Sequence, residues 1–342
     1  MNNTFNVKTV SSKQHLIRLF FGLILLLVLL LMSITVGNKP IPLAETWQAV
    51  WAFDETNSNH LLVQHIRIPR SFVAVIAGFA LGTAGVVIQS LTRNPLSDPG
   101  ILGINAGATL AVVISIAFFG FYHVFTHMLF GMLGALFAGL IVVYLADLAG
   151  RSDPIRVVLS GIALSAVLLA FAQIIIVNSD DQVFDQYRHW IVGSLQGRGY
   201  EVLGLLSLVT LIGLILAMVM SRSLDTMSLG KELSYALGLN PMMVWLLSAL
   251  VVMLLAGATT AAIGPIAFIG LTAPHIARFF TGPNHRWLLP YAMLISALLM
   301  LCADILGRWL VHPAEVSVGI MVALIGGPFF VALARRKRLF EL

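Results

Sequence analysis

Long apolar stretches separated by short polar connections dominate the chain. A membrane-spanning helix needs about 20 consecutive, mostly apolar residues, and ten stretches meet or approach this length. They are Leu16–Val36, Ser71–Leu91, Gly100–Phe121, Phe125–Leu148, Ile155–Val177, Val202–Met220, Met242–Ile263, Pro265–Phe280, Leu288–Leu310 and Val316–Leu333. The eighth is the shortest and contains Pro274. The pattern predicts an all-α integral membrane protein with about ten transmembrane helices, in one polytopic domain over residues 1–342.

The first stretch could also be a cleaved signal peptide, because Lys8, Lys13 and Arg18 precede its apolar run. The run is longer than a signal peptide needs, and no small-residue cleavage site follows it. We therefore expect an uncleaved membrane helix there.

Composition supports a protein that lies in lipid. Only 10% of the 342 residues are charged and 59% are hydrophobic, with a mean hydropathy of +0.95. Soluble domains carry about 25% charged residues, so this chain could not cover a surface that faces water. The pI of about 9.6 does not predict a nucleic-acid partner, because the basic residues do not gather on a soluble face.

The sequence indicates no cofactor. The single cysteine, Cys302, excludes a disulfide framework and a cysteine metal site. His123 and His127 have a spacing that can chelate a metal, but they fall at a short turn without a nearby carboxylate or cysteine. We therefore expect no metal site.

The basic residues predict the orientation, because they concentrate in cytoplasmic loops. With ten spans and an inner N-terminus, 14 of them lie inside: Lys8, Lys13, Arg18, Arg93, Arg151, Arg156, Arg222, Lys231, Arg278, Arg286, Arg335, Arg336, Lys337 and Arg338. Six lie outside: Lys39, Arg67, Arg70, Arg188, Arg198 and Arg308. This bias favours cytoplasmic N- and C-termini.

The one sizeable inner loop, residues 221–241, carries a helical pattern over Ser228–Leu239. Asp225 precedes it as a start signal, and Gly238 with Pro241 gives a stop. The segment either rests passively on the membrane or docks a cytoplasmic partner. The candidate docking residues are Ser228, Leu229, Gly230, Glu232, Leu233, Ala236, Leu237 and Gly238.

Glycine and proline interrupt the apolar pattern at residues 93–103, 264–274 and 325–330. Non-helical backbone at membrane depth is tolerated where protein or a water-filled cavity satisfies it, and such breaks often line transport routes. Simple kinks or surface turns would give the same residues. The candidates for broken helices near the route are Asn94, Pro95, Pro265 and Pro274.

Enzymatic chemistry has no support in the sequence. No phosphate-binding GxxxxGK[ST] motif occurs, and no HExxH or Ser/His/Asp arrangement lies within a span. No chain of acidic residues crosses a span, which weakens the case for an ion-coupled carrier.

Several ordered runs resemble the permeases of ABC importers for ferric siderophores, haem and cobalamin. They are RIPR at 67–70, GFALGTAGVVIQSLTRNPLSDPGILGINAGA at 78–108, LSGIALS at 159–165, HWIVGSL at 189–195, LDTMSLGKELSYALGLN at 224–240, GPIAFIGLTAPHIARFFTGPNHRWLLP at 264–290, ADILGR at 303–308 and PAEVSVGIMVALIGGPFF at 313–330. The run at 93–108 is closer to siderophore permeases than to cobalamin ones.

The resemblance implies a multi-pass subunit of the bacterial cytoplasmic membrane that passes a ferric siderophore inward. It implies helices two to five and seven to ten as inverted repeats, a second permease, two ABC ATPase subunits and an external binding protein. The inner loop would couple to the ATPase, and Arg67, Arg70 and Arg308 would face outward to dock the binding protein. A haem or cobalamin permease and an ion-coupled carrier are the alternatives. Neither the siderophore nor the identity of the second permease follows from the sequence.

Overall fold

The computed structural model describes residues 11–37, 39–147, 154–311 and 314–335. Its helices are α1 Ser12–Thr35, α2 Leu43–Trp51, α3 Ser58–Leu62, η1 Val63–Arg67, α4 Ile68–Thr92, η2 Pro99–Leu102, α5 Ile104–Phe119, α6 Val124–Asp147, α7 Pro154–Val177, α8 Asp181–Ile191, α9 Tyr200–Val219, α10 Ser221–Ser228, α11 Lys231–Ala236, α12 Pro241–Ile263, α13 Ile269–Thr281, α14 His285–Leu310 and α15 Val318–Ala334. Of the predicted inner basic residues, Lys8, Arg151, Arg336, Lys337 and Arg338 lie outside the described ranges.

The prediction of about ten transmembrane helices is confirmed. Each predicted stretch corresponds to one helix of the bundle: α1, α4, α5, α6, α7, α9, α12, α13, α14 and α15. Within the described residues, seven helical segments are both long and apolar enough to cross a membrane. The others, α5, α13 and α15, have 16, 13 and 17 residues.

Glycine and proline explain why two of these short helices begin later than predicted. Ahead of α5, residues 99–102 form a separate 3₁₀ turn, and Gly103 with a φ of 73° divides that turn from the helix. Ahead of α13, residues 264–268 are not helical. Only from Ile104 and Ile269 onward does each chain segment follow a regular helix.

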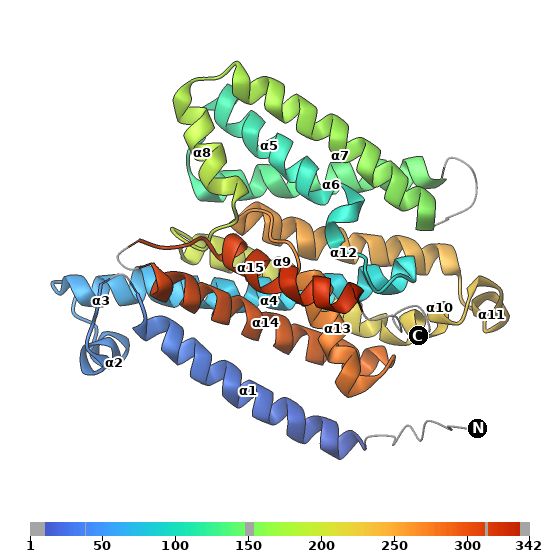
Figure 1. Cartoon of the computed structure of the whole chain (residues 1–342), viewed down its shortest axis with the longest axis horizontal. Coiled ribbons are helices and arrows are strands. Elements are labelled where there is room, and N and C mark those ends of the chain that lie inside the picture. The colour runs from blue at the N-terminus through green and yellow to red at the C-terminus, as the bar shows by residue number, and fades with distance from the viewer. Residues whose placement is uncertain (1–10, 38, 148–153, 312–313, 336–342) are drawn as a thin grey trace.

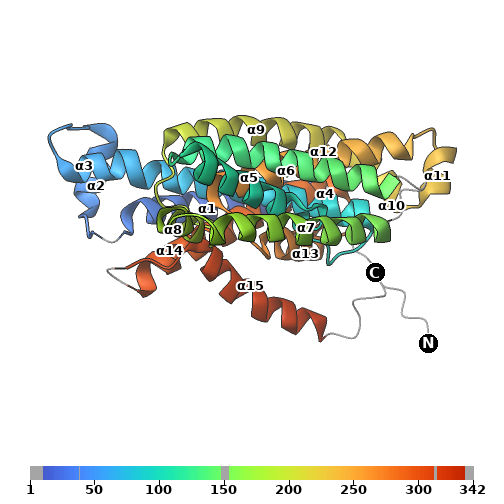
Figure 2. The ribbon, with the colours of Figure 1, turned by 90° about the horizontal axis from the view of Figure 1, so that it is seen from above.

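Figure 1 shows a bundle whose two ends carry different elements. The helices α2, α3 and α8 lie at one end, while α10 and α11 lie at the other, where α1 begins and α15 ends. We call these the outer end and the inner end, following the predicted orientation. The helices α4 and α12 are mostly buried, whereas α1 and α7 expose apolar side chains as expected beside lipid. Figure 2 shows α15 leaning away from the rest of the bundle.

Two groups of four helices pack in the same pattern. The first group is α4 to α7 and the second is α12 to α15. In this pattern α12 is equivalent to α4, α13 to α5 and α14 to α6. The contact between α4 and α14 matches the contact between α12 and α6. Likewise, α5 with α6 matches α13 with α14, and α4 with α13 matches α12 with α5. Each group begins with a long buried helix followed by a non-helical break. This pattern is the one that paired repeats produce.

The prediction that Pro274 breaks a helix is wrong, because Pro274 lies inside α13. A proline within a helix removes the hydrogen bond to the carbonyl four residues earlier, which here belongs to Gly270. The backbone of α4 lies directly against this carbonyl, since a Cβ on Gly85 would come within 1.9 Å of Gly270 O. The backbone of α4 thus packs closely against the carbonyl that lacks its helical hydrogen bond.

Candidate functional site

The outer end holds a buried group of charged side chains, which we call the outer cluster: Arg67, Arg70, Asp304, Arg308 and Glu315. Arg70 donates to Asp304 Oδ1 through Nε and Nη2, at 3.0 and 2.8 Å, and to Glu315 Oε2 through Nη1 at 2.7 Å. Arg308 Nη2 lies 2.7 Å from Asp304 Oδ2, near enough for an ion pair but not aligned as a hydrogen bond. Asp304 therefore pairs with two guanidinium groups at once.

Arg67 and Arg308 also bind the end of α1. The acceptors are the carbonyl oxygens of Ser33, Ile34, Thr35, Val36 and Lys39 and the hydroxyl of Ser33. The last carbonyls of a helix have no partner within it and carry the negative end of the helix dipole. Two of the three arginines thus serve as a cap for α1.

Local sequence brings Arg67 and Arg70 to this position. Pro69 stands in the first turn of α4, where its missing N–H costs little. Just before it, residues 63–67 form a π-helical turn, a feature frequent at functional sites. The two arginines therefore sit on either side of this junction and reach different partners.

The structure buries the side chains of the three arginines at the outer end. Arg67, Arg70 and Arg308 are only 3%, 6% and 2% exposed. A buried charge is costly unless it is paired and hydrogen-bonded, and Asp304 and Glu315 supply that pairing for Arg70. Sequence reasoning missed both acids as partners, although they stand in the runs ADILGR and PAE that flank the turn before α15. The docking role of the arginines stays a prediction.

At the inner end, the helix predicted over Ser228–Leu239 begins at a different place. Ser228 ends α10, and Gly230 with a φ of 117° separates it from α11. The helix α11 ends before Gly238, which has a φ of 80°, as the predicted stop requires. Asp225 does not start this helix, because it lies within α10 and binds His285 instead.

The helix α11 lies at the inner end of the bundle (Figure 1), and the segment around it exposes apolar side chains. Leu229, Leu233 and Leu237 are 61%, 47% and 60% exposed, and Ala236 and Glu232 are also exposed. No part of the described chain covers these leucines. Exposed apolar surface of this kind marks a site of interaction.

A second polar group lies where α4, α10 and α14 meet, and we call Ser90, Arg93, Asp225 and His285 the inner junction. Asp225 Oδ1 accepts from the His285 backbone N–H at 3.0 Å and from its Nδ1 at 2.6 Å. The other ring nitrogen, Nε2, lies 2.5 Å from Ser90 Oγ. Burial alone would raise the pKa of Asp225, but the hydrogen bonds from His285 lower it below its ordinary value.

The Ser90–His285–Asp225 set has the order of a nucleophilic triad, which no motif in the sequence announced. Ser90 is part of helix α4, and its hydroxyl also donates to the Val86 carbonyl at 2.8 Å. Serines within helices commonly bond back in this way. The hydroxyl is therefore committed to the helix backbone, and the arrangement is one of attachment between three helices.

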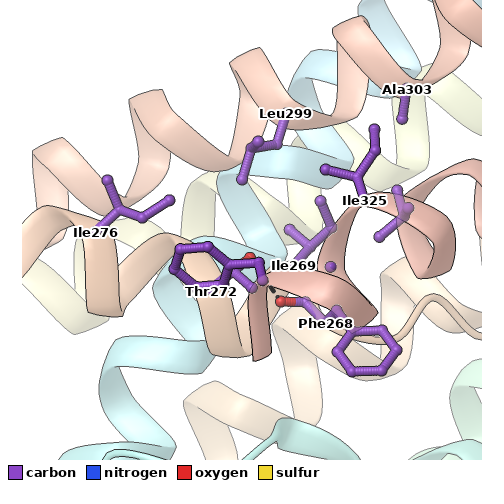
Figure 3. A pocket seen from close by; sticks show the side chains of 10 residues that line it. Phe268, Ile269, Thr272, Ile276, Leu299, Ala303 and Ile325 are labelled. Carbon is purple, nitrogen blue, oxygen red and sulfur yellow. Dashed lines mark hydrogen bonds between the residues drawn. The ribbon is translucent and has the colours of Figure 1, made fainter. Parts of the chain in front are cut away.

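The predicted breaks at Asn94, Pro95 and Pro265 are non-helical. At the second break, Phe268 adopts a φ of 67°, which is uncommon for a residue with a side chain. Its ring lines an apolar groove of about 70 Å³ between α13, α14 and α15, with Thr272, Leu299 and Ile325 (Figure 3). The Thr272 hydroxyl donates to Phe268 O at 2.8 Å, the bond drawn in Figure 3, and holds the turn in place.

The two histidines considered for a metal are engaged otherwise. His127 Nε2 lies 2.7 Å from the Phe121 carbonyl, and exposed His123 lies 4.0 Å from Glu201. Over the residues that the structure describes, no group of three or more His, Cys, Asp or Glu side chains could hold a metal.

Comparison with known proteins adds the family. Residues 25–336 match the FecCD transport family. The chain belongs to this family. It is 40% identical to the ferric enterobactin transport system permease protein FepD of Escherichia coli (strain K12), over 92% of this chain and 94% of that protein. It is 37% identical to the hemin transport system permease protein HmuU of Yersinia pestis, over 95% and 97%.

A solved structure agrees with this assignment. An ABC transporter of the metal-chelate type in an inward-facing conformation matches with a TM-score of 0.82 and 27% identity, over 94% of this chain and 99% of that one. A FecCD protein is the multi-pass membrane permease of an ABC importer and not an enzyme, since the ATPase is a separate subunit. A partner permease and an ATPase therefore belong to the working assembly.

Proposed function

We propose that this chain is the permease of an ATP-driven importer that carries a ferric siderophore across the bacterial cytoplasmic membrane. The observation that carries the proposal is the 40% identity with a ferric enterobactin permease along nearly the whole of both chains. The assembly would contain a second permease, identical or homologous, two ATPase subunits and an external substrate-binding protein.

Haem import is the second candidate, because a hemin permease is 37% identical over a similar length. Uptake of ⁵⁵Fe-labelled enterobactin, hydroxamate siderophores, ferric citrate and haem should be measured in a strain that lacks the gene. Restored uptake of one or more siderophores, with no haem uptake, is the expected result. Restored uptake of haem alone would overturn the siderophore proposal.

The exposed leucines of the α10–α11 segment would dock the ATPase. Support comes from three observations: the segment protrudes at the inner end, its apolar side chains are uncovered, and Gly230 and Gly238 fix its shape with positive φ angles. A helical segment that lays an apolar face into a groove is a common docking mode.

The outer cluster would dock acidic residues of the external binding protein. It contains three arginines against two carboxylates, so one positive charge remains unbalanced within it. Arginine can hold a carboxylate with two hydrogen bonds. Because Glu315 is only partly buried, with its side chain 16% exposed, a carboxylate from outside could approach Arg70 beside it or replace it.

The non-helical segments at Pro95 and Pro265 would lie near the route or the interface between permeases. The apolar groove beside Phe268 supports this proposal, because it opens next to the break and to α15, the helix that leans away from the bundle (Figure 2).

A further inference from the structure

The inner end of α4 is attached to three different helices within two turns. Gln89 accepts from Arg278 of α13 at 2.5 Å. Ser90 Oγ lies 2.5 Å from His285 of α14, and Arg93 Nη2 donates to the Met227 carbonyl of α10 at 2.9 Å. The end of α4 therefore holds α10, the first part of the proposed coupling segment, by a direct hydrogen bond.

His285 attaches α10 a second time, through α14. Its backbone and its ring both donate to one oxygen of Asp225, and its side chain is only 6% exposed. A two-point contact from a buried residue fixes the orientation of α10 about its own axis as well as its distance. The inner junction thus makes α10 part of the same body as α4 and α14.

The same two helices reach the outer cluster. They run antiparallel in contact from end to end: Arg70 with Asp304, Gly78 with Ala297, Gly82 with Ser296, and Ser90 with His285. A Cβ on Gly78 would come within 2.5 Å of Ala297 Cα, and the Ser296 hydroxyl donates to Gly78 O at 2.5 Å. Packed interiors transmit displacement because they have little free space.

We propose that Ser90, Asp225 and His285 are positioning residues that make the α10 segment move as one body with α4 and α14. This inference rests on the proposed docking of the ATPase at the α10–α11 segment. A displacement of that segment by the ATPase is then delivered to α4 and α14 and reaches the outer cluster at their other ends. Without the inner junction, the segment would still bind the ATPase, but its displacement would not be transmitted to α4 and α14.

The test uses the complete importer, with ATPase and binding protein, reconstituted in liposomes. The variants are Asp225→Ala, His285→Gln, their combination and Ser90→Ala, with Arg222→Gln on the exposed face of α10 as the matched control. The measurements are ATPase association, ATP hydrolysis and uptake of the ⁵⁵Fe-siderophore that wild type transports best. Transport per ATP hydrolysed should fall on the order of tenfold in Asp225→Ala and His285→Gln, a size typical of coupling between sites.

Association with the ATPase should stay at the wild-type level in these variants, because the leucines around α11 are untouched. The double variant should be no worse than the poorer single one, since the two side chains act on each other. Ser90→Ala removes only the hydroxyl oxygen and should lower transport per ATP hydrolysed by less. This variant still tests the proposal if the other variants do not assemble. Unchanged transport per ATP in every assembled variant would overturn the proposal.

Lost ATPase association would also contradict it, because the junction would then serve docking instead of transmission. A failure of the docking proposal is seen separately, as unchanged ATPase binding when the leucines themselves are altered.

Discussion

The two ends of the α4–α14 pair differ in whether their side chains already have partners within the chain. At the outer end, charged side chains are buried and bound to one another and to the end of α1. At the inner end, His285 is buried, but the leucines around α11 stay uncovered. A partner at the outer end would have to compete with existing contacts, whereas a partner at the inner end would cover a surface that is already free.

Replacing Asp304 with alanine tests the outer end and should give the largest loss of stability. It would leave Arg70 and Arg308 facing each other without their shared carboxylate, and removing one partner of a buried ion pair costs about 3–5 kcal/mol. Unfolding of the detergent-solubilised protein should show this loss. The control is Asp185→Ala, because Asp185 pairs with Arg188 on the surface with about 60% of each side chain exposed. Equal stability of the two variants would show that the outer cluster does not hold the helices together.

The middle of the bundle links the two ends, and Gly85→Ala should disturb it next. The new Cβ would lie 1.9 Å from the Gly270 carbonyl, so α4 and α13 would have to separate. Overpacking of this kind costs about 1–3 kcal/mol. Gly204→Ala in α9 has open space around the new Cβ and should leave the unfolding midpoint nearly unchanged. An equal response of both variants would argue against a tight α4–α13 contact.

Leu233→Asp tests the uncovered inner surface. If the ATPase buries this side chain, its affinity for the permease should fall about tenfold or more, because burial of a leucine is worth about 1.5–3 kcal/mol. Membrane levels of the permease should be unchanged, since Leu233 is already 47% exposed. The matched control is Leu43→Asp, the same change at a 72% exposed leucine of α2 at the other end. Normal ATPase binding by Leu233→Asp would exclude the docking role.

Glu315→Gln tests docking at the outer end and should give the smallest of these effects. It removes a carboxylate that competes with an acidic partner for Arg70, so the external binding protein should bind more tightly, by up to about tenfold at low salt. Binding to the reconstituted importer at two salt concentrations measures this. Glu201→Gln removes an exposed charge at the same end and should change little. Weaker or unchanged binding by Glu315→Gln would contradict docking at Arg70.

The spans and their breaks could be predicted from the sequence because they depend on local properties. Hydropathy over about 20 residues marks a helix in lipid, and glycine or proline marks its interruption, as at Pro95 and Pro265. Pro274 shows the limit of this reasoning. Whether a proline breaks a helix depends on what surrounds the freed carbonyl, and here that is the backbone of α4 around Gly85.

The exposure of the α10–α11 segment also followed from its sequence, whereas the burial of the arginines did not. Arg70 meets Asp304 across 234 positions, and His285 meets Asp225 across 60. A charge near the end of an apolar stretch can face water or a partner, and the stretch itself contains no information on which. The choice depends on whether another helix brings a carboxylate or a helix end within about 3 Å, and only the packing of α1, α4 and α14 against one another decides that.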